Sequence, residues 1–410
     1  MRVYCCSWNV ARLLPSDDLA LEDWLNVDAD ERADIYSVCL QEVSLFPPTV
    51  VSDDPWTKSV TETFARHSVI RLSRGRQLGL ILMIFVRPYL LPFITNIEEE
   101  YVATGIGGVV GNKGAAMIRF RLHGVPLCFT GVHMAAHTKN LERRNEEYHQ
   151  ILKTKFSDPR CETLLDHEFV FWSGDLNYRL DESVSQERAV AAVHSNETDS
   201  LKPFDQLRQE QSKGAAFSEF LEGPITFPPT YRYDVGTQDF DSSPKARVPS
   251  WCDRILWRSR HKLEIGLQQD TYTSYQQYCN SDHKPIAARF TIEFQPENAK
   301  QNVEFAFPKT TWACNQNASI LYSLEPGTNV SSWDWIGLYK IGWCNLKDYV
   351  TYCWACSDDK LLQRRRCQVI LDAAAVPSEP GLFQLIYHSR KYDRVLGISP
   401  IFEISKECYV

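Results

Sequence analysis

The chain has 410 residues, of which 44% are hydrophobic, 12% aromatic and 23% charged. These proportions are typical of soluble globular proteins and exclude a disordered, collagen-like or coiled-coil chain. The net charge of −8 argues against nonspecific nucleic-acid binding, because such binding depends on an excess of Lys and Arg that neutralises phosphates. It still allows a local basic pocket for a compact polyanion.

At about 100–200 residues per domain, the length predicts two domains. The longest apolar run, 78–86, is far shorter than the ~20 residues that a membrane-spanning helix needs. The first residues show no signal-peptide pattern, and neither end carries a lipidation motif. We therefore expect a cytoplasmic protein with peripheral membrane contact at most, its 13 cysteines reduced.

The predicted elements, taken in chain order, divide the sequence in two. Residues 1–295 alternate strand-like apolar runs with helical stretches, whereas residues 303–405 show short β-rich runs separated by turn signals. The polar segment 294–302 contains proline and is typical of a linker. The sequence thus predicts an α/β domain at 1–295, a linker at 296–302 and a smaller β domain at 303–410.

Strand-like runs of the first domain begin or end beside polar residues capable of chemistry. These residues are Asn9, Glu42, His133, Asp175, Asp253 and the pair Asp282-His283. One such residue alone is better explained as a turn residue or as a buried polar group with a hydrogen-bond partner. Six run ends of this kind predict a shared crevice at one edge of a layered α/β fold.

The residue types at these ends suggest a metal and an acid–base pair. Asn9 and Glu42 offer oxygen ligands without sulfur, which suits Mg²⁺. Asp282 and His283 are a candidate pair in which the carboxylate fixes the tautomer of the imidazole, although an Asp-His dipeptide alone is a weak signal.

Two further motifs lie at run ends. In GDLNYR (174–179), Asp175 and Asn177 point to the same side of an extended segment and could orient water and stabilise an oxyanion; an Asx-turn is the alternative. In GVHMAAH (131–137), His133 and His137 are four residues apart, but the glutamate of a HExxH zinc motif is missing.

Two segments suggest phosphate binding. GIGGVVGNKGAAMIRF (105–120) offers glycine amides and Lys113 but lacks the P-loop pattern, and it could be a plain turn. Tyr231, Arg232, Lys245 and Arg247 form a cationic group shortly before Asp253. Such a group suits a substrate with several phosphates, although a solvated basic loop is the alternative.

Eight motifs in order make the first domain resemble the inositol polyphosphate 5-phosphatases. They are SWNV (7–10), QEV (41–43), GNKGAAMIRF (111–120), GVHMAAH (131–137), FWSGDLNYR (171–179), PPTYRYD (228–234), RVPSWCDRILW (247–257) and SDHKP (281–285). The resemblance implies a four-layer α/β/β/α sandwich of the endonuclease/exonuclease/phosphatase type. It also implies Mg²⁺-dependent removal of a 5-phosphate from phosphoinositides or soluble inositol phosphates by direct in-line attack of water.

The resemblance also implies roles for individual residues. Asn9 and Glu42 would hold the metal, Asp282 would orient His283, and Asp175 would position water. Asn177 and His133 would stabilise the pentacoordinate phosphorus. The residues that would contact substrate are Lys113, His137, Arg179, Tyr231, Arg232, Lys245 and Arg247. Arg232 stands where the family commonly has Lys, which leaves substrate preference less certain than reaction type.

The second domain is similar to the SKICH module, an immunoglobulin-like all-β sandwich, on the strings at 333–355 and 382–399. This likeness implies targeting to a membrane, at the endoplasmic reticulum or plasma membrane, or to a protein partner. We expect a monomer, phosphoinositide headgroups as ligands and no nucleic acid. Lipid cleavage needs a surface that docks onto bilayers, and the apolar segments 227–232 and 78–91 are the candidates.

Two other functions compete with this interpretation. A phosphodiesterase of the same fold, of nuclease or sphingomyelinase type, would cleave a diester with a single phosphate. Such a substrate would not need the cationic group around Lys245 and Arg247. A non-catalytic phosphoinositide-binding adaptor would lack catalytic residues, and the motifs retain all of them.

Overall fold

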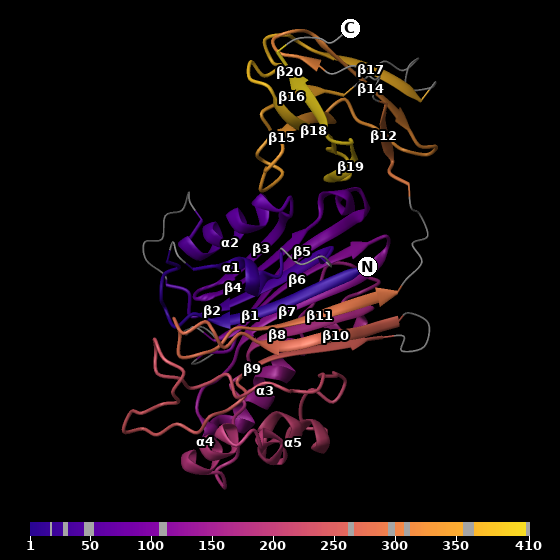
Figure 1. Cartoon of the computed structure of the whole chain (residues 1–410). Helices are drawn as coiled ribbons and strands as arrows, with labels where there is room; N and C mark the ends of the chain where they lie inside the picture. The colour runs from indigo at the N-terminus through magenta and orange to yellow at the C-terminus, as the bar shows by residue number, and fades with distance from the viewer. Residues whose placement is uncertain are drawn as a thin grey trace.

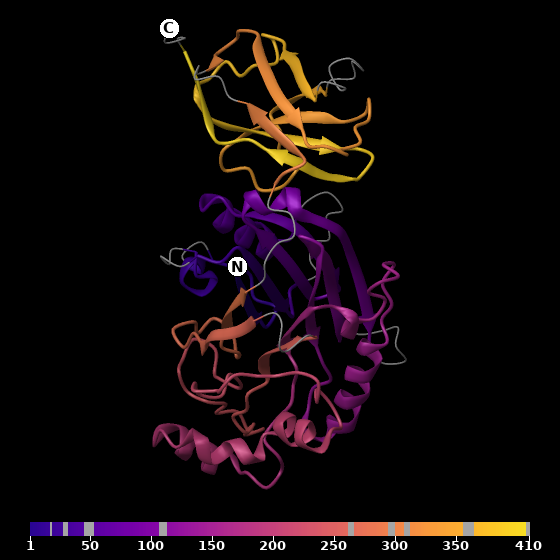
Figure 2. The ribbon, with the colours of Figure 1, turned by 90° about the vertical axis from the view of Figure 1, so that its right-hand side faces the viewer.

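A computed structural model describes residues 1–16, 19–27, 32–44, 53–105, 113–260, 266–293, 300–306, 312–355 and 365–406. The linker predicted at 296–302 therefore lies mostly outside the described residues, as does most of the glycine-rich segment 105–112. Figures 1 and 2 show two domains stacked end to end, with the larger one formed by the first part of the chain.

The larger domain contains two β-sheets packed face to face. The six-stranded sheet runs in the order β10 (Gly266–Ser274), β11 (Ile286–Glu293), β1 (Arg2–Asn9), β2 (Ile35–Gln41), β4 (Leu80–Val86) and β3 (Ile70–Gln77). The five-stranded sheet runs in the order β5 (Ile94–Ala103), β6 (Gly114–Leu122), β7 (Val125–His133), β8 (Phe169–Asp175) and β9 (Asp253–Ser259). Apolar side chains of both sheets, such as Leu82 and Phe129, form the core between them.

Helices cover the outer face of each sheet. They are α1 (Leu21–Leu25), α2 (Pro55–Arg66), α3 (Leu141–Leu152), α4 (Gln186–His194) and α5 (Gln206–Lys213), and Figure 1 shows α1 and α2 on one side of the sheets and the others on the opposite side. In the described part of the chain they are accompanied by short 3₁₀ helices at Pro88–Phe93, Thr138–Asn140, Leu164–Asp166 and Thr198–Phe204. Trp8 packs edge-on against Trp24 and Trp56 under α1 and α2. The predicted four-layer α/β/β/α sandwich is confirmed.

Local sequence explains where these helices begin and end. Helix α2 begins at Pro55, whose fixed φ suits the first helical turn, and the Asp54 carboxylate accepts a hydrogen bond from Thr57 N at 3.0 Å. Helix α5 is capped in the same way by Asp205 and ends at Gly214, which has a positive φ of 70°.

The smaller domain is an all-β sandwich, as predicted. One sheet contains β12 (Val303–Ala306), β14 (Ala318–Leu324) and β17 (Arg366–Leu371). The other contains β13 (Trp312–Ala313), β20 (Phe402–Ser405), β18 (Gly381–Ser389), β15 (Trp335–Lys340) and β16 (Thr351–Trp354), with β19 (Arg394–Ile398) paired to β18. Alternate residues of these strands, such as Ile336 and Leu338, face the core between the sheets.

The two domains share an apolar contact. Tyr339 and Trp343 of the smaller domain join the same buried cluster as Leu90 and Leu91 of the larger one. The backbone of Arg71 donates to the carbonyl of Cys344 at 2.9 Å across the junction. The smaller domain is therefore seated on the larger one and is not merely tethered to it.

The structure corrects the expected positions of bilayer-docking loops. Within 227–232, Phe227 and Tyr231 are only 6% and 7% exposed, and β4 buries most of 78–91. In the second segment Leu78 and Tyr89 are the large apolar side chains that are exposed, at 47% and 49%. Among the described residues, no helix is both long and apolar enough to cross a membrane.

Candidate active site

Strand register brings the predicted site residues to one edge of the paired sheets. His133 ends β7 and pairs with Asp175 at the end of β8, and Asp175 pairs with Asp253 at the start of β9. Neighbouring positions in such a row hold their side chains about 5 Å apart on one face. From the other sheet, Asn9 at the end of β1 meets this row through a hydrogen bond from its Nδ2 to Asp175 Oδ2, at 3.0 Å.

Asp175 lies at the centre of this group and is 1% exposed. Its Oδ2 is 3.3 Å from His133 Nε2 and 3.9 Å from His283 Nε2, and its Oδ1 accepts a hydrogen bond from Asn177 N at 3.1 Å. Burial alone would raise the pKa of Asp175, but its bond with His133 and the charges of His283 and Lys113 hold that pKa well below its usual range. The carboxylate is therefore ionised at neutral pH.

Gly174 explains why this strand end has its particular backbone. Its φ is +146°, and a Cβ there would lie 2.1 Å from the carbonyl oxygen of Val132 on the neighbouring strand. Only glycine fits so close an approach between β7 and β8 just before Asp175.

His283 is oriented by Asp253, which corrects the prediction that Asp282 does this. The Nδ1 of His283 lies 2.8 Å from Asp253 Oδ2, which also accepts a hydrogen bond from the Thr230 hydroxyl at 2.7 Å. The carboxylate of Asp282 lies instead 3.5 Å from Arg232 Nε. The physical reason is that adjacent side chains on an extended segment point apart, whereas β9 presents Asp253 directly to the imidazole.

This environment sets the charge of His283. Burial lowers the pKa of its imidazole, but the carboxylates of Asp253 and Asp175 outweigh burial and raise that pKa to about 9. His283 is consequently an imidazolium at neutral pH, with Nδ1–H donated to Asp253 and Nε2–H directed toward Asp175.

Ser281 and Trp8 fix the His283 segment to β1. The Ser281 hydroxyl donates to the carbonyl oxygen of Asn9 at 2.6 Å and accepts from His283 N at 3.1 Å. The indole N–H of Trp8 donates to the carbonyl of His283 at 3.0 Å. The position of the imidazole is thus tied to the strand end that carries Asn9.

Asn9 and Glu42 lie where a hard cation could bind. Asn9 is 1% exposed, and Glu42, directly after β2, is partly exposed with its Oε1 3.8 Å from His133 Nε2. The oxygens of Asn9, Glu42 and Asp175 form a set without sulfur, open on the Glu42 side, which fits a Mg²⁺ ion that keeps waters or takes substrate oxygens. Asp175, Asp253 and His283 also have potential metal-ligand atoms within 4.8 Å of one another. Asp253 and His283 are, however, already hydrogen-bonded to each other.

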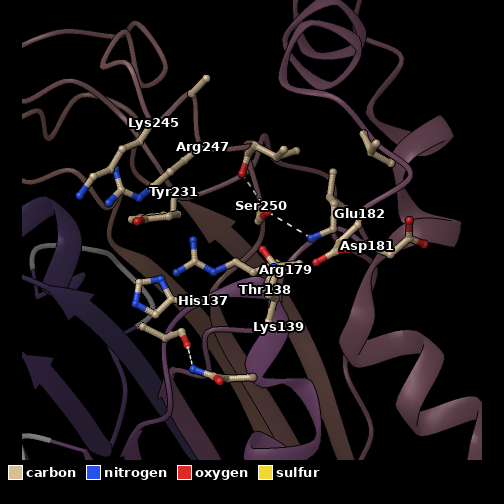
Figure 3. Close-up of a pocket in the computed structure, with 16 residues that line it drawn as sticks. His137, Thr138, Lys139, Arg179, Asp181, Glu182, Tyr231, Lys245, Arg247 and Ser250 are labelled. Carbon is tan, nitrogen blue, oxygen red and sulfur yellow. Dashed lines mark hydrogen bonds between the residues drawn. The ribbon is translucent and has the colours of Figure 1, made fainter.

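A basic cavity of about 750 Å³ opens beside this row. In Figure 3, His137, Arg179, Tyr231, Lys245 and Arg247 gather on one side of the cavity and Asp181 and Glu182 on the other. The guanidinium of Arg179 stacks over the ring of Tyr231 at 4.1 Å, and that ring lies 4.5 Å from the ring of His283. These contacts connect the cavity to the residues around Asp175.

Two predicted substrate residues lie elsewhere. Arg232 points to Asp282 and to Asp241, at 3.5 and 3.8 Å, and is not among the residues lining the cavity. Lys113 contacts the imidazole Nε2 of His133 on the catalytic side, and burial lowers the pKa of its ammonium. Asn177 donates one amide hydrogen to the carbonyl of Met134 at 3.0 Å.

Sequence reasoning missed the roles of Asp253, Thr230 and Ser281. Asp253 was predicted to lie in the shared crevice because it stands beside an apolar strand, but nothing in its sequence position indicated that it, rather than Asp282, contacts His283. Thr230 and Ser281 sit inside the PPTYRYD and SDHKP motifs but have side chains common in any turn. Only the tertiary contacts distinguish them.

Comparisons with known proteins agree with this geometry. Residues 6–289 match the model of "Endonuclease/Exonuclease/phosphatase family 2", and residues 303–404 match the SKICH domain. Mouse inositol polyphosphate 5-phosphatase K is 31% identical over 98% of this chain and 90% of its own length. The chain belongs to the inositol polyphosphate 5-phosphatase family.

Other members of this family show the same relationship. Human phosphatidylinositol 4,5-bisphosphate 5-phosphatase A is 34% identical over 98% of this chain, which spans only 42% of that protein's length. The inositol polyphosphate 5-phosphatase domain of SPsynaptojanin, solved with inositol (1,4)-bisphosphate and calcium ion, is 34% identical over 70% of this chain and 83% of its own, with a TM-score of 0.60. A Cimex nitrophorin at 23% identity and a TM-score of 0.59 shares the fold alone.

Proposed function

We propose that the chain is a Mg²⁺-dependent phosphatase that removes the 5-phosphate of phosphatidylinositol 4,5-bisphosphate and phosphatidylinositol 3,4,5-trisphosphate, and of soluble inositol polyphosphates. The observation that carries the proposal is the row of His133, Asp175 and Asp253, faced by His283 and opening onto a basic cavity of about 750 Å³. Its products are inorganic phosphate and an inositol ring with a free 5-hydroxyl.

Asn9 and Glu42 are the residues proposed to hold Mg²⁺, which would neutralise negative charge on the reacting phosphate. Asp175 and His283 are proposed to act on the attacking water and on the phosphoryl group. Asp175, kept ionised, accepts a hydrogen bond from water and aligns its oxygen with phosphorus. His283, kept protonated, donates its Nε2–H to a phosphoryl oxygen as charge develops there.

His133 and Asn177 complete the polar surroundings of the phosphorus. Both are almost fully buried, at 1% and 2% exposure, so hydrogen bonds that they donate are not weakened by competing water. The P–O bond to the inositol ring breaks as the bond from water forms. The attacking water loses a proton by way of Asp175 to solvent, and the leaving ring oxygen takes up a proton to become the 5-hydroxyl, so that no phosphorylated side chain is needed.

The cavity explains why a substrate with several phosphates is proposed rather than a diester. Lys245, Arg247 and Arg179 present cations within a single cavity, next to the Tyr231 ring that touches His283. One guanidinium can bind two oxygens of the same phosphate. The cations of Lys245, Arg247 and Arg179 therefore suit a second phosphate beside the one that is cleaved. The neighbouring 4-phosphate is the proposed ligand.

The cellular context is part of the proposal. Because a lipid substrate lies in a bilayer, we propose a cytoplasmic enzyme with peripheral contact to the endoplasmic reticulum or plasma membrane, which the SKICH domain directs to a membrane or protein partner. The enzyme is proposed to act as a monomer.

The first experiment measures phosphate release, with Mg²⁺ and with EDTA, from three substrates. They are short-chain phosphatidylinositol 4,5-bisphosphate, the 3,4,5-trisphosphate and soluble inositol 1,4,5-trisphosphate. We expect Mg²⁺-dependent release that vacates the 5-position. Folded protein that releases phosphate from none of them would contradict the proposal and favour a diesterase or a binding-only protein.

A further inference from the structure

An exposed group of aromatic rings lies on the outer face of the smaller domain. In the pairing of β15 with β16, Trp335 lies opposite Trp354 and Gly337 opposite Tyr352. The alternate residues Ile336 and Leu338 are 1% exposed and face the core, so Trp335 and its partners face outward. These rings, together with Trp333 and Tyr349, are called the aromatic strip below.

The rings of the aromatic strip are contiguous and open to solvent. Ring centroids lie 6.0 Å apart for Trp333 and Trp354, 5.6 Å for Tyr352 and Trp354, and 5.2 Å for Trp335 and Tyr349. Trp333 is 66% exposed, Trp354 51%, Tyr352 46% and Tyr349 41%. Contiguous exposed apolar area of this kind marks a surface for interaction, because single exposed apolar residues are common but clusters are not.

The strip is held rigidly by the strands beneath it. The imidazole of His388 on β18 stacks against Trp335 at 3.9 Å, with 10° between the ring planes. A Cβ on Gly337 would lie 2.7 Å from a ring carbon of Tyr339 and 2.9 Å from one of Trp335, so glycine leaves room for these rings to lie on the strand. The buried Asp334 fixes the turn that carries Trp333, since its carboxylate accepts from Ser331 N and Arg390 N.

The strip continues an interface that the molecule already uses. Tyr339, on the same face of β15, contacts Tyr349 of the strip at 6.4 Å and Trp343 at 4.9 Å, and both Tyr339 and Trp343 are buried with Leu90 and Leu91 of the larger domain. This face therefore begins in the junction between the domains and runs outward into solvent. Its direction relative to the catalytic domain is set by that junction.

The exposed end of the face lies on the same side as the candidate active site. Figure 1 shows β15 and β16 on the side of the upper domain toward which β1 points, and Asn9 is the last residue of β1. The loop that follows Asn9 carries Leu13 and Leu14, which are 38% and 61% exposed.

Basic side chains lie beside the strip. Lys347 is exposed two residues before Tyr349, and Arg390, whose backbone is bonded to Asp334, is exposed together with Lys391. Asp348, between Lys347 and Tyr349, is also exposed, but its carboxylate accepts hydrogen bonds from the backbone of Cys344 and Asn345, so cations still outnumber the carboxylate here. Tryptophan and tyrosine prefer the headgroup level of a bilayer, where the ring is apolar and the N–H or O–H stays hydrated. Lysine and arginine next to such rings favour anionic lipid.

We propose that the aromatic strip docks onto the interface of an anionic phospholipid bilayer and holds the active site toward that surface. The proposal rests on the lipid substrate of the proposed function, but bilayer binding can be measured without catalysis. It commits to a bilayer; a second copy of the chain or a protein partner on this face would overturn it.

The test uses the full chain and sedimentation with vesicles of phosphatidylcholine and phosphatidylserine. The variant Trp333→Ser/Trp354→Ser removes two exposed rings with little effect on the core, and we expect vesicle affinity to fall about tenfold or more because apolar area is no longer buried in lipid. The control Ile370→Ser changes a side chain that is 62% exposed on β17, in the other sheet, and should bind as wild type. Trp333→Phe/Trp354→Phe should restore most of the binding.

Hydrolysis rates on soluble and on vesicle-bound substrate provide an independent test. The serine variant should hydrolyse soluble inositol 1,4,5-trisphosphate at the wild-type rate and phosphatidylinositol 4,5-bisphosphate in vesicles more slowly. Equal vesicle binding by wild type and the serine variant would overturn the docking proposal, as would a wild-type dimer, seen by light scattering, that the variant converts to monomers. Absence of all hydrolysis with intact vesicle binding would instead contradict the proposed function and leave docking supported.

Discussion

At the scale of single residues, the charge of His283 depends mainly on the carboxylates of Asp253 and Asp175, with a smaller contribution from Asp282. Burial alone would lower its pKa, whereas Asp253 and Asp175 raise that pKa to about 9. The imidazolium that we propose to contact phosphate is therefore present at neutral pH and lost as pH rises through about 9. Asp253 is then a positioning residue, because it acts through the imidazole.

We expect Asp253→Asn to lower kcat on soluble inositol 1,4,5-trisphosphate by about 10²–10⁴-fold. It should also move the alkaline limb of the kcat/KM profile to lower pH, because loss of one carboxylate lowers the pKa of His283. The matched control is Asp282→Asn, because that carboxylate contacts Arg232 and raises the pKa of His283 less than Asp253 does, so its displacement of the limb should be smaller. Equal displacement of the limb in both variants would contradict the assignment of Asp253.

The proposed metal ligands give a second prediction at this scale. Glu42→Gln keeps the size of the side chain and removes its charge, so the Mg²⁺ concentration for half-maximal activity should rise about 10–100-fold. The control is Glu99→Gln, on the exposed part of β5. A magnesium titration that is unchanged in Glu42→Gln would remove Glu42 from the site.

At the scale of elements, strand β9 is anchored by a buried arginine. Arg254 is fully buried, and its guanidinium binds Asp205 at 2.9 Å and Glu222 at 2.5 Å. These bonds join β9 to the N-terminus of α5 and to the segment before the PPTYRYD motif. The start of the same strand carries Asp253, so the anchor also helps to hold the row of His133, Asp175 and Asp253 in register.

Arg254→Met should lower the free energy of unfolding by about 3–5 kcal/mol, because two buried carboxylates lose their cation. Urea denaturation followed by tryptophan fluorescence measures the change. Arg260→Met removes an exposed guanidinium just after the strand and should cost less than about 1 kcal/mol. Similar losses in the two variants would show that the buried network contributes no special stability.

At the scale of the whole molecule, His388 links the aromatic strip to the junction between the domains. Its Nε2 lies 2.8 Å from the Tyr339 hydroxyl, and burial lowers the pKa of the imidazole to about 3. The unfolded chain, with a histidine pKa of about 6.5, binds a proton at higher pH than the folded chain. The stability from neutral His388 is thus complete above about pH 6.5 and is lost as pH falls toward 3.

This linkage predicts that acidification from pH 7 to pH 5 lowers the free energy of unfolding by up to about 2 kcal/mol through His388. His388→Phe keeps a ring against Trp335 but cannot titrate, so its stability should depend less steeply on pH over this range. Denaturant titrations of both proteins at pH 7, 6 and 5 supply the comparison. Parallel pH dependences would show that His388 is not the responsible group.

Removal of residues 303–410 tests how far the domains depend on each other. The truncation uncovers Leu90 and Leu91, which are buried in the shared cluster, and should lower the melting temperature of the larger domain. Hydrolysis of soluble inositol 1,4,5-trisphosphate should persist, because the residues proposed to act in catalysis all lie in the larger domain, and the protein should relocate in cells. Complete loss of catalysis by a folded truncated protein would mean that the junction supports the active site.

The amino-acid sequence predicted an α/β domain followed by a β domain, its family resemblance implied the four-layer sandwich, and it named most of the residues that the structure gathers at one edge of the sheets. Asn9, Glu42, His133, Asp175 and His283 each lie beside a buried strand, and a strand end is a local property that apolar runs reveal. The edge at which these ends meet then follows from the layered architecture. The eight motifs, taken in their order along the chain, indicated the family.

Tertiary structure alone decided which of these residues touch. Sequence adjacency favoured Asp282 as the partner of His283, but the packing of one sheet on the other presents Asp253, thirty residues away, to the imidazole. The same packing turned Arg232 away from the cavity and buried the Phe227 segment that was expected to meet lipid. Side-chain direction and burial depend on contacts between distant strands, and nothing in the local sequence encodes them.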